Sequence, residues 1–196
     1  MKRGPEKQFC PTEALQKAME VFLARGYQGA SLSELLDQMG IGRKSLYDTF
    51  GNKHELFLKT LELYSQTAIK EMQDQLAAPG SPKANIEAVM LKWQDANSQP
   101  DSKGCLIGNN LADFCTEDTG MARVLSEHLT QLENAFTDAV TRAQAAGEVP
   151  ADIPPGDLAR LLVCLGQGVA LMGRVTTDQT HFKGVFEAIL TLLRPA

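Results

Sequence analysis

The chain has 196 residues, and its 19 basic and 24 acidic side chains give a formal charge of -5, which argues against a uniformly basic nucleic-acid coat protein. Apolar residues make up 43% and charged residues 22%, ordinary proportions that argue against wholesale disorder. No stretch reaches the roughly 20 apolar residues of a membrane span. No apolar run follows the charged N-terminus as in a signal peptide, and four scattered cysteines do not form a disulfide framework. We expect a cytoplasmic protein with reduced cysteines.

The charge is unevenly distributed along the chain. Residues 1–60 carry nine basic and seven acidic side chains, a net +2, whereas residues 61–196 carry ten and seventeen, a net -7. Such an asymmetry between two parts of a chain hints at two different tasks.

Apolar residues recur at helical spacing between breaks made by proline and glycine, and no run alternates as a β-strand does. The pattern predicts an all-α fold of about nine helices. Two helix starts carry the capping-box pattern, Ser31 with Glu34 and Asn52 with Glu55. The predicted helices span residues 11–26, 31–40, 43–50, 52–76, 83–98, 105–116, 121–146, 156–175 and 180–193. In the fourth helix the predicted buried stripe is Leu56, Phe57, Leu61, Tyr64, Ala68, Met72 and Leu76.

Residues 31–50 have the layout of a helix-turn-helix, two helices of about eight residues joined by Gly40-Ile41-Gly42. Leu46 and Phe50 lie four residues apart and can pack against the helix predicted at residues 11–26. The side chains on the other face of the helix at residues 43–50 are short, polar or basic. A helix in a major groove needs such a face, because donors must reach phosphates and short side chains must reach base edges. The outward residues are Arg43, Lys44, Ser45, Tyr47, Asp48 and Thr49.

These residues resemble the TetR family of transcriptional regulators. The resemblance is carried by Phe22-(x3)-Gly26-Tyr27, by SLSELL at 31–36 and by GIGRKSLYDTFGNK at 40–53. It covers about 45 residues in order, and beyond residue 60 only the length and the helical architecture fit. It implies a helix-turn-helix DNA-binding domain at residues 1–55 and an effector-binding and dimerisation domain at residues 56–196.

The resemblance also implies a repressor that works as a homodimer. Its two helix-turn-helix units would read an operator of two half-sites on double-stranded DNA, and a small-molecule effector would release it. The sequence has no Cys or His residues at metal-ligand spacing, no glycine-rich phosphate loop and no catalytic Ser/His/Asp pattern. We therefore expect no cofactor and no enzymatic activity.

The resemblance assigns the DNA contacts residue by residue. It places Arg43, Lys44 and Ser45 at the start of the recognition helix, Tyr47 and Lys53 at phosphates, and Ser31 and Ser33 at the start of the preceding helix. Asp48 and Thr49 stand where the family often has His and Tyr. Asp48 either accepts a hydrogen bond from a cytosine amine or restrains Lys44. For Tyr47, the alternative to a phosphate contact is a buried position in the core.

The effector pocket is expected within residues 60–145, and its Met and aromatic side chains favour a small hydrophobic ligand. The candidate walls are Met90, Trp93, Cys105, Asn109, Phe114, Leu125, Leu129 and Phe136. For each of them a plain core position is the alternative. In the family the last two helices pair with their symmetry mates, and close approach at that dimer seam would explain Gly166, Gly168 and Gly173.

Cys105 supports an alternative regulatory mechanism, sensing of oxidants or electrophiles by a thiol. Its Gly-Cys-Leu context is similar to that of a subgroup of the family, and a helix start beside Lys103 favours the thiolate. Cys115, ten residues on in a continuous helix, is too far away for a disulfide within one chain. A small buried hydrophobe is the other interpretation of Cys105.

Overall fold

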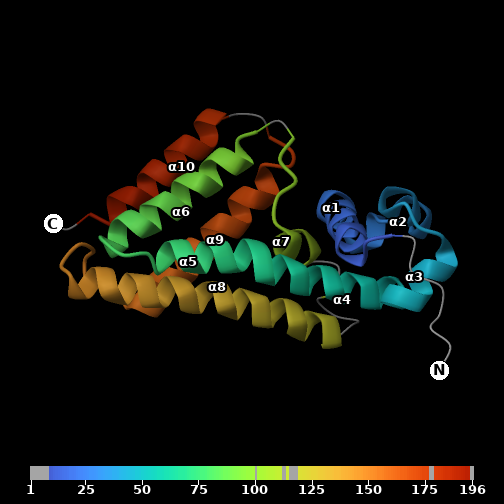
Figure 1. Ribbon diagram of the computed structural model, residues 1–196. Coiled ribbons are helices and arrows are strands. Elements are labelled where there is room, and N and C mark those ends of the chain that lie inside the picture. The colour runs from blue at the N-terminus through green and yellow to red at the C-terminus, as the bar shows by residue number, and fades with distance from the viewer. Residues whose placement is uncertain (1–8, 100, 112–113, 115–118, 177–178, 195–196) are drawn as a thin grey trace, which may run out of the picture. The chain divides into compact units, whose positions relative to one another are not determined.

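The computed structural model describes residues 9–99, 101–111, 114, 119–176 and 179–194. Every regular element within these ranges is a helix, which confirms the all-α prediction (Figure 1). The chain divides into two compact units, Met1–Gln66 and Thr67–Ala196, here called the smaller and the larger unit. The division falls after the fourth helix, whereas the expected domain boundary at residue 55 falls near the start of that helix.

The smaller unit is built around α1, which packs against α2 and α4, while α3 packs against α4. Phe22 of α1 and Phe57 of α4 are fully buried, with their rings in edge contact at 4.9 Å. Gly26 has a φ of 73° and interrupts α1 where the sequence predicts its end. The four helices are α1 (Pro11–Gly29), α2 (Leu32–Met39), α3 (Arg43–Phe50) and α4 (Lys53–Tyr64).

The two predicted capping boxes form to different extents. The Asn52 side chain accepts from the Glu55 amide at 3.0 Å and the Asn52 amide donates to the Glu55 carboxylate at 2.8 Å, which confirms the box at α4. At α2 the Ser31 hydroxyl accepts from the Glu34 amide at 3.1 Å. The Glu34 carboxylate, however, accepts from Arg25 Nε at 3.0 Å, so this box is only half formed.

A π-helical turn, η1 (Ser65–Ile69), follows α4 directly and leads into α5 (Lys70–Leu76). The predicted stripe of the fourth helix is therefore wrong at its centre, because Ala68 is exposed and Ile69 is buried in its place. A π turn holds an extra residue and so changes which positions after it share the buried face. The sequence between residues 53 and 76 contains no proline or glycine that would predict a break.

In the larger unit α6 occupies a central place, since it contacts α5, α8, α9 and α10 (Figure 1). The two longest helices of this unit, α8 and α9, pack along each other, and Phe136 of α8 and Leu162 of α9 are fully buried. The five further helices of this unit are α6 (Pro82–Asn97), α7 (Leu106–Asn110), α8 (Thr119–Ala145), α9 (Pro155–Met172) and α10 (Gln179–Leu192).

The predicted helix over residues 105–116 is too long. α7 has five residues and ends at Asn110, whose side-chain amide donates to the Leu106 carbonyl at 2.6 Å. Gly108, Asn109 and Asn110 are poor helix formers, which accounts for the early end. Cys115 lies outside the described residues, so its expected separation from Cys105 stays a prediction.

A long-range contact fixes the start of α6. Ser81 caps the helix by accepting from the Ala84 amide at 3.0 Å. The Glu148 carboxylate, from the segment between α8 and α9, accepts from the Ser81 hydroxyl at 2.8 Å and from the Lys83 amide at 3.0 Å. The hydrogen bonds from Lys83 and Ser81 lower the pKa of Glu148. The charged carboxylate therefore stabilises a helix start, where backbone amides lack intrahelical partners.

Candidate nucleic-acid interface

The turn between α2 and α3 takes its shape from Gly40, which has a φ of 67° and ends α2 in the left-handed conformation. The Ile41 amide donates to the Leu36 carbonyl at 3.2 Å, so the last turn of α2 is closed. α3 then begins at Arg43 after Gly42. The two helices and the short turn form the predicted helix-turn-helix.

The orientation of α3 is determined by Leu46 and Phe50, which are both buried. Tyr47 is 50% exposed, which decides against its alternative position in the core. Ser45 and Thr49 are half-buried at the flanks of the helix. Of the six residues predicted to face outward, the four that are exposed are Arg43, Lys44, Tyr47 and Asp48.

Groups that can bind phosphate lie at the N-termini of α2 and α4. Ser31 and Ser33 are exposed at the start of α2, and the Ser31 hydroxyl, which accepts from Glu34, retains its proton for donation. Lys53 is the first residue of α4, and its Nζ lies 4.6 Å from the centroid of the Tyr27 ring. A cation over an aromatic face is held electrostatically, so Tyr27 positions the Lys53 ammonium. Sequence reasoning used Tyr27 as part of the motif but missed this role.

Four of the residues predicted to line an effector pocket are buried in the larger unit: Met90, Phe114, Leu125 and Phe136. Trp93 is half-buried, and its ring meets Phe136 edge-on at 5.5 Å. Leu129 is also half-buried. The structure thus brings Trp93 and Phe136 together, in an arrangement that also serves as plain core.

Cys105 and Asn109 lie where α7 approaches α9. The Asn109 side chain donates to the Lys103 carbonyl at 2.7 Å and holds the loop before α7. Gly104 has a φ of 75°, and a Cβ there would lie 2.8 Å from the Ala170 carbonyl of α9. Cys105 is half-buried at the N-cap of α7, with Lys103 exposed two residues earlier.

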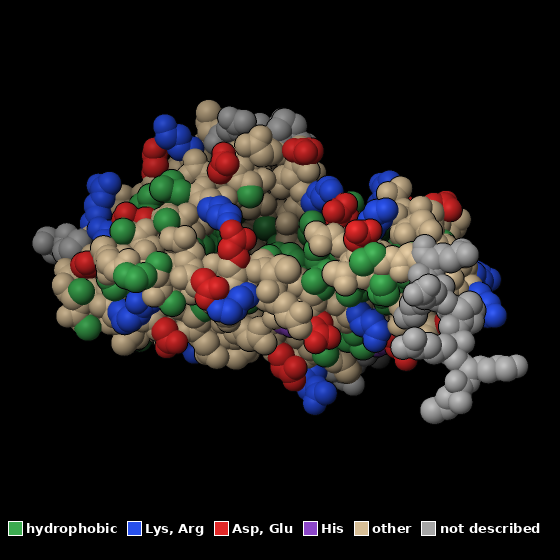
Figure 2. All heavy atoms as spheres, viewed as in Figure 1, with side chains coloured by type: hydrophobic (Ala, Val, Ile, Leu, Met, Phe, Trp, Pro, Cys, Tyr) green, Lys and Arg blue, Asp and Glu red, His purple; other side chains and the backbone are tan. Residues whose placement is uncertain are grey.

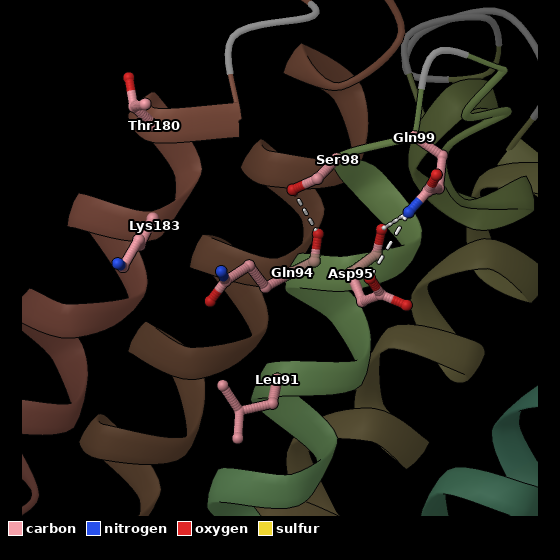
Figure 3. A pocket seen from close by; sticks show the side chains of 7 residues that line it. All are labelled: Leu91, Gln94, Asp95, Ser98, Gln99, Thr180 and Lys183. Carbon is pink, nitrogen blue, oxygen red and sulfur yellow. Dashed lines mark hydrogen bonds between the residues drawn. The ribbon is translucent and has the colours of Figure 1, made fainter.

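A groove of about 440 Å³ lies between α6 and α10 (Figure 3). Ser98 and Gln99 at its edge bond to the Gln94 and Asp95 carbonyls of their own helix. The groove is lined by Leu91, Gln94, Asp95, Ser98, Gln99, Thr180 and Lys183. Its lining includes none of the predicted effector contacts, and six of its seven lining residues have polar or charged side chains.

The expectation that Gly166, Gly168 and Gly173 all lie at a dimer seam is wrong for two of these glycines. Gly166 is buried against α6, and a Cβ there would overlap the Trp93 ring. A Cβ at Gly173 would lie 2.6 Å from the Asn97 carbonyl of α6. Only Gly168 is exposed, with open space where a side chain would be. Two of the glycines therefore serve close packing of α6 on α9 within one chain.

The apolar faces of the last two helices are likewise used mainly within the chain. Buried residues include Leu158, Leu162 and Val169 of α9, Phe182, Phe186 and Ile189 of α10, and Leu193 directly after α10. Leu161 (44%) and Leu171 (54%) are exposed on a second face of α9, and Val175 (88%) is exposed just beyond the end of this helix.

The larger unit contains a histidine whose pKa is shifted, His128. Burial lowers the pKa of His128, against opposing effects of a Gln131 hydrogen bond and the Glu127 charge. In the described part of the chain no three His, Cys, Asp or Glu side chains gather as a metal site would require. No helix there is long and apolar enough to cross a membrane. Basic and acidic side chains are intermingled on the visible face of this unit (Figure 2), unlike a DNA-binding surface.

Comparison with known proteins identifies both units. Residues 14–60 match the family described as bacterial regulatory proteins, tetR family, and residues 82–189 match the tetracyclin repressor-like C-terminal domain. An uncharacterized HTH-type transcriptional regulator of Bacillus subtilis, YezE, is 33% identical over 97% of this chain and 99% of its own. The HTH-type transcriptional repressor ComR of Escherichia coli is 28% identical over 88% of this chain and 83% of its own.

Solved structures agree with this assignment. A cysteine mutant of the TetR family regulator CifR, complexed with 26-base-pair operator DNA, superposes with a TM-score of 0.83 at 28% identity, covering 95% of this chain and 98% of that one. The reduced form of E. coli NemR has a TM-score of 0.82 at 19% identity, covering 94% and 98%, which supports the fold alone. The chain therefore belongs to the TetR family of DNA-binding transcriptional regulators, and it is not an enzyme.

Proposed function

We propose that this regulator is a homodimeric repressor that a small hydrophobic effector releases from an operator of two half-sites. The observation that carries the proposal is the outward face of α3, where Arg43, Lys44 and Tyr47 are all exposed. A tyrosine kept half in solvent beside two cations is poorly explained by folding, since burial of its ring would be favourable. It is well explained by contact with a DNA backbone. Because that operator is its partner, the repressor acts in the cytoplasm.

The DNA contacts come from three helix starts. Arg43, Lys44 and Ser45 open α3, and Thr49 flanks the same face one turn later. Phosphates would be bound by Tyr47, by Lys53 at the positive end of α4, and by Ser31 and Ser33 at the start of α2. The net charge of the first 60 residues is only +2, so affinity depends on these placed groups and on their use twice by a dimer.

The exposed face of α9 supports a dimer. Leu161, Cys164, Gly168 and Leu171 are all exposed and follow one another at intervals of three, four and three residues. This is the heptad spacing with which a helix buries a seam against a second helix. A second copy of the chain covering this face would place two recognition helices on DNA, with half-sites about one helical turn or a multiple apart.

The effector would bind in the larger unit, beside the aromatic pair of Trp93 and Phe136 and the adaptable Met90. Leu125, Leu129 and Phe114 supply further apolar surface, and Asn109 a polar contact. Binding there releases the operator if the effector prefers the conformation that does not fit DNA.

Thiol sensing by Cys105 is the second candidate for the regulatory signal. It is favoured by the half-buried position of Cys105 before α7, with Lys103 close in sequence. One similar structure, at 28% identity, is a cysteine mutant bound to operator DNA. Treatment of the operator complex with N-ethylmaleimide should release wild type but not Cys105→Ser. Equal release of both proteins would exclude this candidate.

Selection of bound fragments from genomic DNA tests the main proposal. Purified protein should enrich a sequence with two inverted half-sites, and affinity for it should fall steeply with salt because several phosphate contacts release counterions. Affinity no better than that of an unrelated acidic protein would contradict the proposal.

A further inference from the structure

Asp48 is the one acidic residue of α3, and it is exposed. A helix turns about 100° per residue, so Asp48 lies about 160° from Leu46 and the same from Phe50, measured the shorter way round. Both of those side chains are buried. Asp48 is therefore at the centre of the outward face, the position that approaches the groove floor most closely when this face meets DNA.

The carboxylate of Asp48 is not engaged within the described chain. Lys44 lies one turn earlier on the same face, yet the ion pairs of the described residues include neither Lys44 nor Asp48. The hydrogen bonds that cap α3 and α4 come from Gly51, Asn52 and Glu55. Asp48 thus has no evident role in stabilising the fold.

A carboxylate at this place restricts what the helix can read. It is repelled by phosphates and can only accept hydrogen bonds, so it needs a donor on a base edge. In the major groove guanine presents two acceptors and thymine presents an acceptor and a methyl group. Adenine pairs its N6 donor with the N7 acceptor, which repels a carboxylate, whereas cytosine presents the N4 donor alone.

We propose that Asp48 determines sequence specificity by accepting a hydrogen bond from a cytosine N4 amine, once in each half-site. The proposal rests on the proposed function, because it assumes that α3 enters the major groove. Lys44 beside it offsets the negative charge that Asp48 brings near the phosphates. Affinity for unspecific DNA is lowered by the same carboxylate, which sharpens the preference for the operator.

The test selects bound sequences from a randomised duplex library with wild type, Asp48→Asn, Asp48→Ala and the control Asp37→Asn. Asp37 is an exposed acid of α2, so its change removes the same charge from the same unit without altering the face of α3. Wild type and Asp37→Asn should select the same motif, with cytosine at one symmetric position. Asp48→Asn should select adenine there, since an amide both accepts and donates and so fits N6 and N7.

Binding measurements at one fixed salt concentration give the size of the effect. Replacing the selected C·G pair by T·A in one half-site should weaken wild type about tenfold, within the usual cost of a mismatched pair. The same replacement should change the affinity of Asp48→Ala less than about twofold. Loss of sequence preference in either Asp48 variant, with unspecific affinity kept or raised and an unchanged melting curve, also supports the proposal.

Two results would overturn it, and they differ in what else they overturn. If both Asp48 variants select the wild-type motif with equal discrimination at every position, Asp48 reads no base although the proposed function stands. If wild type itself selects no motif, the proposed function fails and this inference fails with it.

Discussion

Replacement of Gly166 by alanine tests the close packing of α6 on α9 in the larger unit. The new methyl group would overlap the Trp93 ring, which meets Phe136 edge-on at 5.5 Å on α8 and so has little freedom to move. Alanine gains about 1 kcal/mol in helix propensity over glycine. Overpacking a well-filled core costs about 1–3 kcal/mol, and we expect the cost of displacing a large ring to lie near the upper end of this range. We expect a net loss of about 1–2 kcal/mol in the free energy of unfolding.

Urea unfolding followed by Trp93 fluorescence measures this change, because Trp93 is the chain's one tryptophan. Gly156→Ala is the matched control, since a Cβ at Gly156 of the same helix meets open space. Gly156 is the second residue of α9, where helix propensity matters less than in the helix interior, so the control should change the free energy of unfolding by less than about 0.5 kcal/mol. A Trp93→Phe change, followed by circular dichroism, should recover part of the loss in the double variant because it vacates the space. Gly166→Ala as stable as wild type would refute the packing argument.

Three further predictions concern the start of α6, the dimer seam and the phosphate contacts. Because the pKa of Glu148 is lowered from 4.5, its charged form stabilises the fold above that pH and the contribution disappears as pH falls through the lowered pKa. Glu148→Gln should therefore melt earlier than wild type at pH 7, the gap in melting temperature should narrow as the pH is lowered below 4.5, and a gap that does not change with pH would contradict this. Gly168→Ala should weaken dimerisation about tenfold in sedimentation if Gly168 lies in the seam, as proposed, whereas unchanged or tighter association would exclude it. Lys53→Gln should reduce the slope of log affinity against log salt by about 2 for a dimer, with Lys59→Gln as an unchanged control, and equal slopes would remove Lys53 from the interface.

The helix-turn-helix was predictable because its signals are local. Gly40 marks the left-handed turn, and Leu46 with Phe50 defines the inward face of α3, so the exposed positions follow from helical geometry. Asn52 with Glu55 marked the start of α4 for the same reason, since a capping box involves only four consecutive residues.

Features that depend on distant partners could not be predicted. Glu34 had the correct spacing to complete a box with Ser31, but Arg25 of another helix takes its carboxylate. Gly166 could be recognised as unusual in a helix, although the Trp93 ring that occupies its space lies far away in sequence. The π turn at Ser65–Ile69 has no signal in the composition. For the same reason, the residues that contact an effector are harder to identify than those that face DNA.

Operator binding by the Arg43→Ala, Tyr47→Ala double variant tests the central claim most directly. Both side chains are exposed on α3 and support no described core contact, so the variant should melt as wild type does. Fluorescence anisotropy with the selected operator should show a loss of affinity of at least a hundredfold, since two contacts are removed from each of two subunits. Wild-type affinity in this double variant would show that the outward face of α3 does not bind the operator.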